Sequence, residues 1–162
     1  MKRREFLVTS ALGSVAALGG RVGAATDGAA AQASRATRKI LIAGGGFNTA
    51  FIRYMATLTG KKRPRICYLP TASADNPNGI VNWFRNCAPL DVEPHVQESF
   101  IASPRQTKGW DEVLLSMDAI VASGGNTLNQ QAIWRAQGID VVLREAWDRG
   151  IVLGGASAGS LC

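Results

Sequence analysis

The sequence predicts an α/β fold in which a mostly parallel β-sheet is covered by helices on both faces. From residue 38 onward, short runs rich in Val, Ile and Leu alternate with longer stretches in which apolar residues recur at helical spacing. The 162 residues have the length of one domain. Because 46% of them are hydrophobic and 19% are charged, the composition excludes a largely disordered chain.

Five apolar runs are predicted to be strands. The first is expected to be buried, and the second is ended by Pro70. The third is expected at a sheet edge, because Pro94 cannot donate a hydrogen bond to a neighbouring strand. The five ranges are 39–43, 65–69, 92–100, 118–122 and 151–155.

Helical stretches separate these strands. One starts at 75–77, with Asp75 interpreted as its cap, and is closed by Pro89. Asp140 is interpreted in the same way as a cap, and Gly138 separates the last two helices. The other predicted helices cover 47–58, 110–115, 128–136 and 140–148.

Charges and cysteines exclude several classes of site. The net charge is +6, and the densest basic segment, 61–65, is a predicted loop without the interleaved aromatic residues of a nucleic-acid interface. Three cysteines without close spacing and one histidine make neither a zinc site nor a disulfide framework. We therefore predict no metal, no cofactor and no nucleic-acid partner, and the oligomeric state stays open.

The glycine run 44–46 after the first strand invites a nucleotide-binding interpretation, which fails on spacing. A dinucleotide fingerprint needs a third glycine where Thr49 stands. It also needs an acidic residue near the end of the second strand, where the chain has Leu69 and Pro70. A tight turn from strand to helix is the prediction for this segment.

Residues 1–33 have the three-part pattern of a secretory leader. A basic start is followed by an apolar stretch from Phe6 to Leu18 and by an Ala/Gly-rich tail. In this tail, 31–33 is a small-x-small cleavage site, and 22–24 and 23–25 are competing sites. Segment 2–8 resembles a bacterial twin-arginine export signal, from which only Val8 departs. This predicts recognition by the twin-arginine export machinery and a periplasmic or extracellular protein. The mature domain then comprises residues 34–162.

The pattern G-x-S-x-G occurs at 155–159, directly after the last predicted strand, as a nucleophile elbow requires. Such a sharp turn lifts a serine hydroxyl to the carboxyl end of the sheet and needs small neighbours, which the chain supplies from Gly154 to Ser160. Ser157 is therefore a candidate nucleophile, and the backbone amide of Ala158 can face a developing oxyanion. A small-residue turn that only packs strand against helix gives the same pattern.

A second loop favours the nucleophile interpretation. Residues 123–126, Ser-Gly-Gly-Asn, end the neighbouring strand candidate, and their glycines allow backbone amides to approach a substrate closely. Gly125 is the predicted second oxyanion donor, with Gly124 and Asn126 as the supporting loop.

Together, segments 66–73, 123–127, 134–140, 143–147 and 155–162 resemble peptidase E, the aspartyl dipeptidase family that also includes cyanophycinase. The resemblance spans 38–162. It implies a flavodoxin-like three-layer sandwich related to class I glutamine amidotransferases and hydrolysis of short peptides with an N-terminal aspartate. It also implies that Ser157 is the nucleophile and that the amides of Gly125 and Ala158 form the oxyanion hole. Cyanophycinase-like hydrolysis is the variant reading.

The chain departs from the family pattern after the nucleophile. In the family, the histidine and the acidic partner of the serine follow the nucleophile in the chain, and neither has a counterpart among the residues up to Cys162. We therefore expect a C-terminally incomplete sandwich that is nearly inactive as it stands. His95 is the one histidine, and its predicted edge strand argues for a surface role. A non-catalytic binding module on the same fold is the alternative function.

Overall fold

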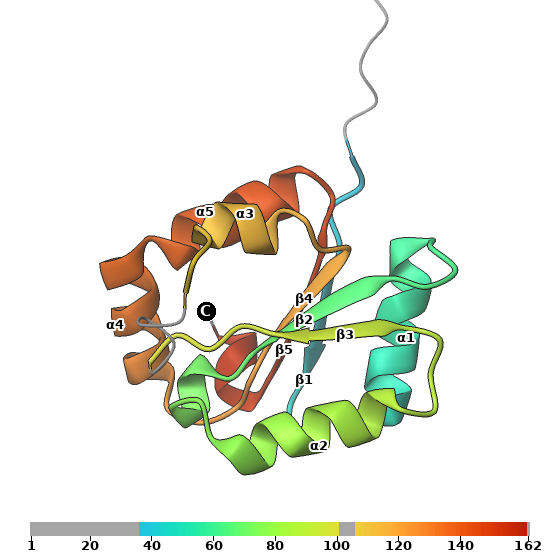
Figure 1. Cartoon of the computed structure of the whole chain (residues 1–162), viewed down its shortest axis with the longest axis horizontal. Helices are drawn as coiled ribbons and strands as arrows, with labels where there is room; N and C mark the ends of the chain where they lie inside the picture. Colours follow the sequence, from blue (N-terminus) through green and yellow to red (C-terminus); the bar gives the residue numbers. More distant parts are fainter. Residues whose placement is uncertain (1–35, 101–105, 162) are drawn as a thin grey trace, which may run out of the picture. The chain divides into compact units, whose positions relative to one another are not determined.

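The computed structural model describes residues 36–100 and 106–161, which share one parallel β-sheet. Its described strands follow the order β1-β5-β4-β2-β3, and every neighbouring pair is parallel (Figure 1). The strands are β1 (Ile40–Ala43), β2 (Arg65–Leu69), β3 (Glu93–Val96), β4 (Ala119–Ala122) and β5 (Val152–Ala156). The predicted α/β class with a mostly parallel sheet is confirmed. The leader prediction for 1–33 falls outside the described residues.

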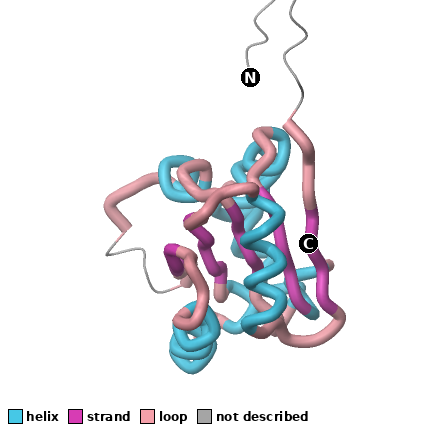
Figure 2. The backbone as a smooth tube through the Cα atoms, turned by 90° about the vertical axis from the view of Figure 1, so that its right-hand side faces the viewer, coloured by secondary structure: helices cyan, strands magenta, loops and turns pink. Residues whose placement is uncertain are grey.

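Helices pack on both faces of the sheet, so that the strands lie between them (Figure 2). Successive residues of a strand point to opposite faces. Ile66 therefore packs with α1 and α2, whereas Cys67 packs with α3, α4 and α5. The helices are α1 (Thr49–Thr59), α2 (Pro77–Cys87), α3 (Trp110–Leu114), α4 (Thr127–Gln137) and α5 (Ile139–Asp148), with short 3₁₀ helices η1 (Thr71–Ser73) and η2 (Ser157–Ser160).

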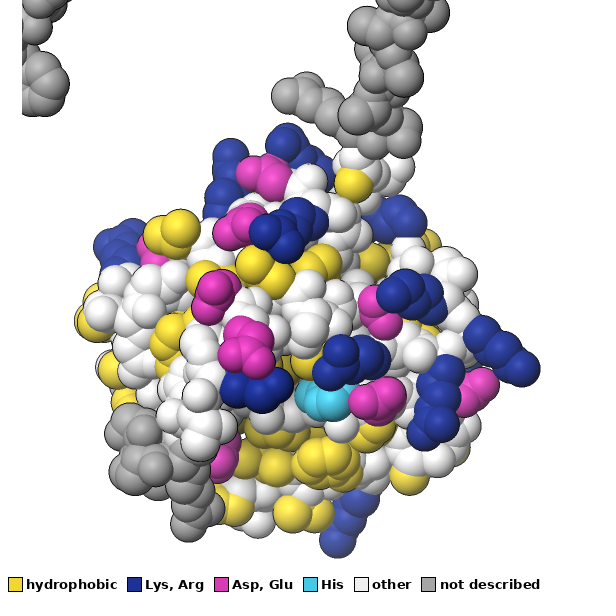
Figure 3. Space-filling view, turned by 45° about the horizontal axis from the view of Figure 1, so that its top comes forward, with side chains coloured by type: hydrophobic (Ala, Val, Ile, Leu, Met, Phe, Trp, Pro, Cys, Tyr) yellow, Lys and Arg dark blue, Asp and Glu magenta, His cyan; other side chains and the backbone are white. Residues whose placement is uncertain are grey.

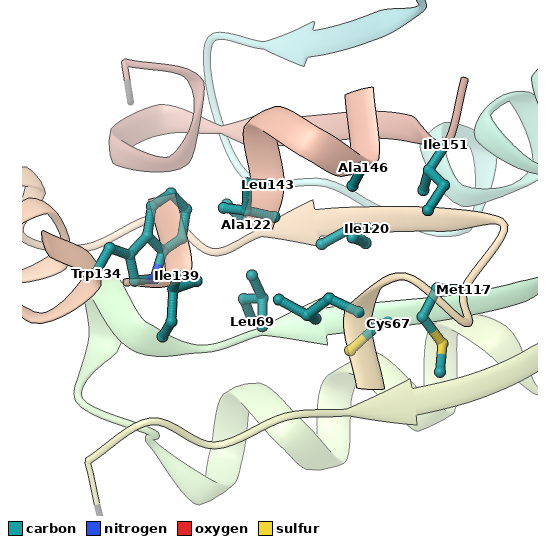
Figure 4. Close-up of a cluster of buried hydrophobic side chains, with 11 residues drawn as sticks. Cys67, Leu69, Met117, Ile120, Ala122, Trp134, Ile139, Leu143, Ala146 and Ile151 are labelled. Atoms are coloured by element: carbon teal, nitrogen blue, oxygen red, sulfur yellow. The ribbon is translucent and has the colours of Figure 1, made fainter. Parts of the chain in front are cut away.

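The cluster on the side of α3, α4 and α5 reaches from one end of the strands to the other. In Figure 4, Trp134 lies at the opposite end of this cluster from Met117 and Ile151.

No helix among the described residues has the length and hydrophobicity needed to cross a bilayer.

The caps of α2 and α5 differ from the prediction. Asn76, not Asp75, caps α2, because its side chain accepts the amide of Asn78 at 2.9 Å. The Asp75 carboxylate instead points into the protein and is 1% exposed. Asp140 lies within the first turn of α5, which begins at Ile139, so it complements the helix dipole without being the cap.

The first strand is less buried than predicted. β1 lies at the edge of the described sheet, and its side chains alternate between a covered and an open face. Leu41 packs against the α1 and α2 cluster, whereas Ile40 and Ile42 are 58% and 64% exposed. They line a groove of about 350 Å³ that also contacts α5 through Leu143. An apolar run by itself does not reveal that only one face is covered.

The third strand has the predicted edge position but is shorter than expected. Among the described strands β3 pairs only with β2, and its ladder ends where the Gln97 amide donates to the Tyr68 carbonyl at 3.0 Å. Beyond that point, Asp75 draws the chain away, because its Oδ2 accepts the amides of Ser99 and Phe100 at 2.8 and 2.6 Å. Competition from a buried carboxylate thus ends the strand.

Candidate active site

Ser157 follows β5 in a sharp turn and opens η2. Its φ of 52° lies in the left-handed region, which costs a non-glycine residue about 1–2 kcal/mol. The side chain is exposed, whereas Ala158 and Gly159 behind it are buried. The bend is tight, because a Cβ added to Gly155 would lie 1.9 Å from the Gly159 carbonyl oxygen. The predicted elbow geometry, an exposed hydroxyl at the carboxyl end of the sheet, is therefore present.

Two hydrogen bonds and a close backbone approach hold this turn. The Ser160 hydroxyl donates to the Ser157 carbonyl at 2.6 Å, and the Leu161 amide donates to the Ala158 carbonyl at 3.1 Å. A Cβ on Gly159 would lie 2.4 Å from the Ala122 carbonyl oxygen, so the elbow rests directly on the end of β4. Only a glycine permits this approach.

Loop 123–126 passes directly beside Ser157, because β4 and β5 are neighbours and Ala122 is in register with Gly155. A Cβ on Gly124 would lie 3.2 Å from the Ser157 Cβ and 3.7 Å from its Oγ. The structure thus brings together the two turns that the sequence predicted to cooperate.

Gly125 and Asn126 fix this loop on η1. Gly125 has a φ of 143°, and a Cβ there would lie 2.1 Å from the Ala72 carbonyl oxygen, so no other residue fits. The Asn126 amide donates to the same carbonyl at 2.7 Å. The Asn126 side chain caps α4 by accepting the Asn129 amide at 2.9 Å. Asn126 thus contacts η1 through its backbone and caps α4 through its side chain, and its supporting role at the site stays a prediction.

Two backbone donors in these neighbouring turns have no backbone partner among the described residues. The Gly125 amide makes no backbone hydrogen bond with the described residues. The Ala158 amide lies in the first turn of η2, where a helix offers its N–H groups no carbonyl partner. Amides of this kind, held in rigid turns, can stabilise an oxyanion. Their role as the oxyanion hole stays a prediction.

His95 does not reach the candidate nucleophile. It lies in β3 opposite Cys67, and β2 and β4 separate its strand from β5. Three strand spacings correspond to about 14 Å. The His95 Nε2 is 2.9 Å from the Glu93 carboxylate, and the histidine lies at the surface among charged side chains (Figure 3). Within 36–100 and 106–161, no histidine or carboxylate is hydrogen-bonded to the Ser157 hydroxyl.

The described part of the chain contains no group of three His, Cys, Asp or Glu residues that could hold a metal ion. The described cysteines, Cys67 and Cys87, are buried thiols, and burial raises the pKa of each to about 12. Such thiols are unreactive.

Tyr68 is a polar residue near the site that sequence reasoning missed. Burial raises the pKa of its phenol and prevails over the neighbouring hydroxyls of Ser123 and Ser73, which lower it. The approach of Ser123 to Tyr68 does not have the geometry of a full hydrogen bond, since the Ser123 Oγ has no such partner among the described residues. The phenol is therefore neutral at physiological pH. Its apolar sequence context, an unbroken strand, gave no signal of this position.

Comparisons with known proteins agree with this geometry. The model of peptidase family S51 matches residues 40–162. The uncharacterized peptidase YgaJ of Bacillus subtilis (strain 168) is 36% identical over 128 residues, which are 76% of this chain and 54% of YgaJ. The chain thus spans about half the length of this relative.

Two solved structures share the fold. A peptidase from an acI-B1 Actinobacterium superposes with a TM-score of 0.62 at 20% identity, over 74% of this chain and 54% of that one. A putative peptidase E protein from Listeria monocytogenes EGD-e superposes with a TM-score of 0.58 at 17% identity, over 76% and 60%. The predicted resemblance to the peptidase E family is confirmed, since the family model covers the strands, the glycine loop and the serine turn described above. The chain belongs to peptidase family S51.

Proposed function

We propose that Ser157 is the nucleophile of a serine peptidase that hydrolyses dipeptides or short peptides with an N-terminal aspartate. The observation that carries the nucleophile is the exposed, left-handed Ser157 with Gly124 packed against its side chain. Membership of a peptidase family supports the reaction class. The aspartate preference rests on the likeness to peptidase E alone.

The geometry suits acyl transfer in two steps. The Ser157 oxygen bonds to the carbonyl carbon of the scissile peptide, while its proton passes to a general base. The carbonyl oxygen becomes an oxyanion that accepts hydrogen bonds from the amides of Gly125 and Ala158. Breakage of the C–N bond then releases the protonated amine, and water hydrolyses the acyl ester and restores the serine.

The 162-residue polypeptide by itself is proposed to hydrolyse peptides very slowly. Among the described residues, no histidine or carboxylate is bonded to the Ser157 hydroxyl to take its proton. A serine without a base is a poor nucleophile. Tests of activity are therefore best made on the gene product that contains this sequence, at whatever length the gene encodes.

Hydrolysis of an Asp-Leu dipeptide, compared between Ser157→Ala and Ser116→Ala, tests the proposal. Ser116 is a matched control, because it is an exposed serine outside the site. Its hydroxyl donates to the carbonyl of Val113, near the end of α3. Loss of the nucleophile should lower kcat by about 10⁴-fold or more, whereas Ser116→Ala should leave it unchanged. Equal activity of both variants contradicts the proposal.

Hydrolysis rates for three substrates test the substrate preference of the protein. An Asp-Leu dipeptide, a Leu-Leu dipeptide and an aspartate-arginine polymer separate aspartyl dipeptidase from cyanophycinase-like activity. If the protein hydrolyses none of these substrates, and its hydrolysis rates equal those of Ser157→Ala, the non-catalytic binding module is favoured.

Export through the twin-arginine machinery is part of the same proposal. Its support is the sequence of residues 2–8, with Arg3 and Arg4 before Phe6 and Leu7. Replacing both arginines by lysine keeps the charge of the leader but should trap the protein in the cytoplasm. Lys2→Arg is the matched control, and cell fractionation is the measurement. Unchanged export of the double variant would contradict this localisation.

A further inference from the structure

Four buried polar residues lie beneath the loop that passes Ser157. We call them the Thr71 cluster, and they come from η1, from the turn after it, from the segment after β3 and from α4. All four are nearly inaccessible, with exposed fractions of 0, 1, 4 and 5%. In that order they are Thr71, Asp75, Ser99 and Trp134. Most polar groups at this depth are hydrogen-bonded, and in this cluster only the Asp75 Oδ1 has no partner among the described residues.

Hydrogen bonds tie these segments together at one hydroxyl. The Ser99 hydroxyl donates to the Thr71 Oγ1 at 2.8 Å, and the Trp134 Nε1 donates to the same atom at 3.0 Å. Asp75 fixes Ser99 in turn, because its Oδ2 accepts the Ser99 amide at 2.8 Å. The Gln137 side chain donates to the Ser99 carbonyl at 2.9 Å, so α4 contacts this segment a second time.

The residue after Thr71 supports the predicted oxyanion loop. The Ala72 carbonyl accepts the Asn126 amide at 2.7 Å and lies directly against the Cα of Gly125. Asn126 also caps α4, and this helix carries Trp134, whose Nε1 donates to the Thr71 hydroxyl. The loop is thus held on η1 at Gly125 and Asn126 and on β2 through the Ser123 amide, which donates to the Leu69 carbonyl at 2.9 Å, while Gly124 lies against Ser157.

Backbone strain accompanies this clamp. Ala74 and Asp75 have φ values of 54° and 57°, and with Ser157 they are the non-glycine residues with positive φ in the described chain. These strained turns follow β2 and β5, at the same end of the parallel sheet. Strain of this kind persists only where the surroundings fix the backbone, and it gathers at functional sites.

We propose that the Thr71 cluster positions Gly124 and Gly125 against Ser157, so that the Gly125 amide meets the oxyanion at the right place. Thr71, Asp75, Ser99 and Trp134 are then positioning residues, which act through the loop without touching substrate. This inference rests on the proposed function of Ser157. An apolar residue at position 71 would fill the same space, but only a hydroxyl joins the Ser99 and Trp134 donors at a fixed point.

Thr71→Val tests the proposal, because valine keeps the shape of threonine and removes only the hydroxyl. Since the oxyanion exists only in the transition state, kcat for the Asp-Leu dipeptide should fall by about 10- to 100-fold, with KM nearly unchanged. Thr71→Ser should retain most of the activity. Thr57→Val is the matched control, because the Thr57 hydroxyl donates to the Tyr54 carbonyl on the exposed side of α1.

Amide hydrogen exchange gives a second readout that does not depend on catalysis. In Thr71→Val the Asn126 amide should exchange faster, because the Ala72 carbonyl that it bonds is no longer held in place. The amides of β1, at the far edge of the described sheet, should keep their protection.

The outcomes separate this inference from the proposed function. If Thr71→Val folds and keeps the kcat of Thr57→Val, or if only its KM changes, the positioning role is wrong while the nucleophile stands. If Ser157→Ala keeps full activity, the proposed function itself is wrong. Should Thr71→Val fail to fold, Ser99→Ala decides by the same criterion, since it removes one of the two hydrogen bonds to Thr71.

Discussion

At the scale of single residues, the backbone conformation of Ser157 lowers the stability of the turn but exposes the serine hydroxyl. Its left-handed backbone is unfavourable for any residue with a Cβ, yet this conformation leaves the hydroxyl exposed at the turn. Gly124 and Gly125 make the complementary adjustment, because their missing side chains let a backbone loop reach the serine on one side and η1 on the other.

Relief of the strain at Ser157 should be measurable. Ser157→Gly should be more stable than Ser157→Ala by about 1 kcal/mol, because glycine adopts a φ of 52° without steric cost. Both variants lack the hydroxyl, so they differ only in the Cβ. Urea unfolding monitored by tryptophan fluorescence gives the two free energies. Equal stabilities would show that the turn is not strained.

At the scale of elements, parallel pairing brings the candidate site together. Because β4 and β5 are neighbours in register, the turns that follow them lie side by side, although they are separated in sequence by α4 and α5. The same order places β3, and His95 with it, away from β5. The caps Asn76 and Asn126 then set where α2 and α4 begin, and the buried Asp75 carboxylate sets where β3 ends.

Neighbouring residues before α2 should differ sharply on substitution. Asn76→Ala removes a helix cap and should cost about 1 kcal/mol. Asp75→Ala should cost at least about 1 kcal/mol more, because it leaves the amides of Ser99 and Phe100 without an acceptor. Urea unfolding of the two variants is the measurement. A larger loss for Asn76→Ala would show that the Asp75 carboxylate contributes little by holding the amides of Ser99 and Phe100.

How far the sequence predicts this architecture depends on the range of the interactions. The boundaries of β2 and the breaks at Pro70 and Gly138 follow from local chemistry, and they were predicted closely. The exposure of Ile40 and Ile42 was not, because it depends on which strand stands at the edge of the described sheet.

The candidate site shows the same division. Ser157 and the glycines of 123–126 were predictable because each turn carries a local signature. The bonds that join Thr71 to Ser99 and Trp134 connect residues 28 and 63 positions apart, and no periodicity or spacing announces them. The burial of Asp75 is unpredictable from local sequence for the same reason, since its partners lie after β3.

At the scale of the whole molecule, buried thiols link stability to pH. Burial raises the pKa of the Cys67 thiol from 9.0 to about 12. A hydrogen bond with the Gln97 backbone lowers this pKa, but by less than burial raises it. In the unfolded chain the thiol ionises near its ordinary value. Because the folded pKa is the higher one, the stabilisation is complete below the ordinary pKa of 9.0 and is lost as the pH rises toward 12.

The free energy of unfolding should therefore fall as the pH is raised above about 9. Cys67→Ala should show a shallower fall than the unchanged protein. The slope should not vanish, because burial raises the pKa values of Cys87 and Tyr68 in the same direction. Urea unfolding over a series of alkaline pH values measures both slopes. Parallel slopes would show that the Cys67 thiol is not shielded from water in the folded state.

The position of a covalent adduct tests the nucleophile most directly. The gene product that contains this sequence can be treated with a fluorophosphonate and mapped by tandem mass spectrometry. We predict one phosphonylated residue, Ser157, and loss of the adduct in Ser157→Ala but not in Ser116→Ala. An adduct on another serine, or the same labelling in Ser157→Ala, would contradict the account.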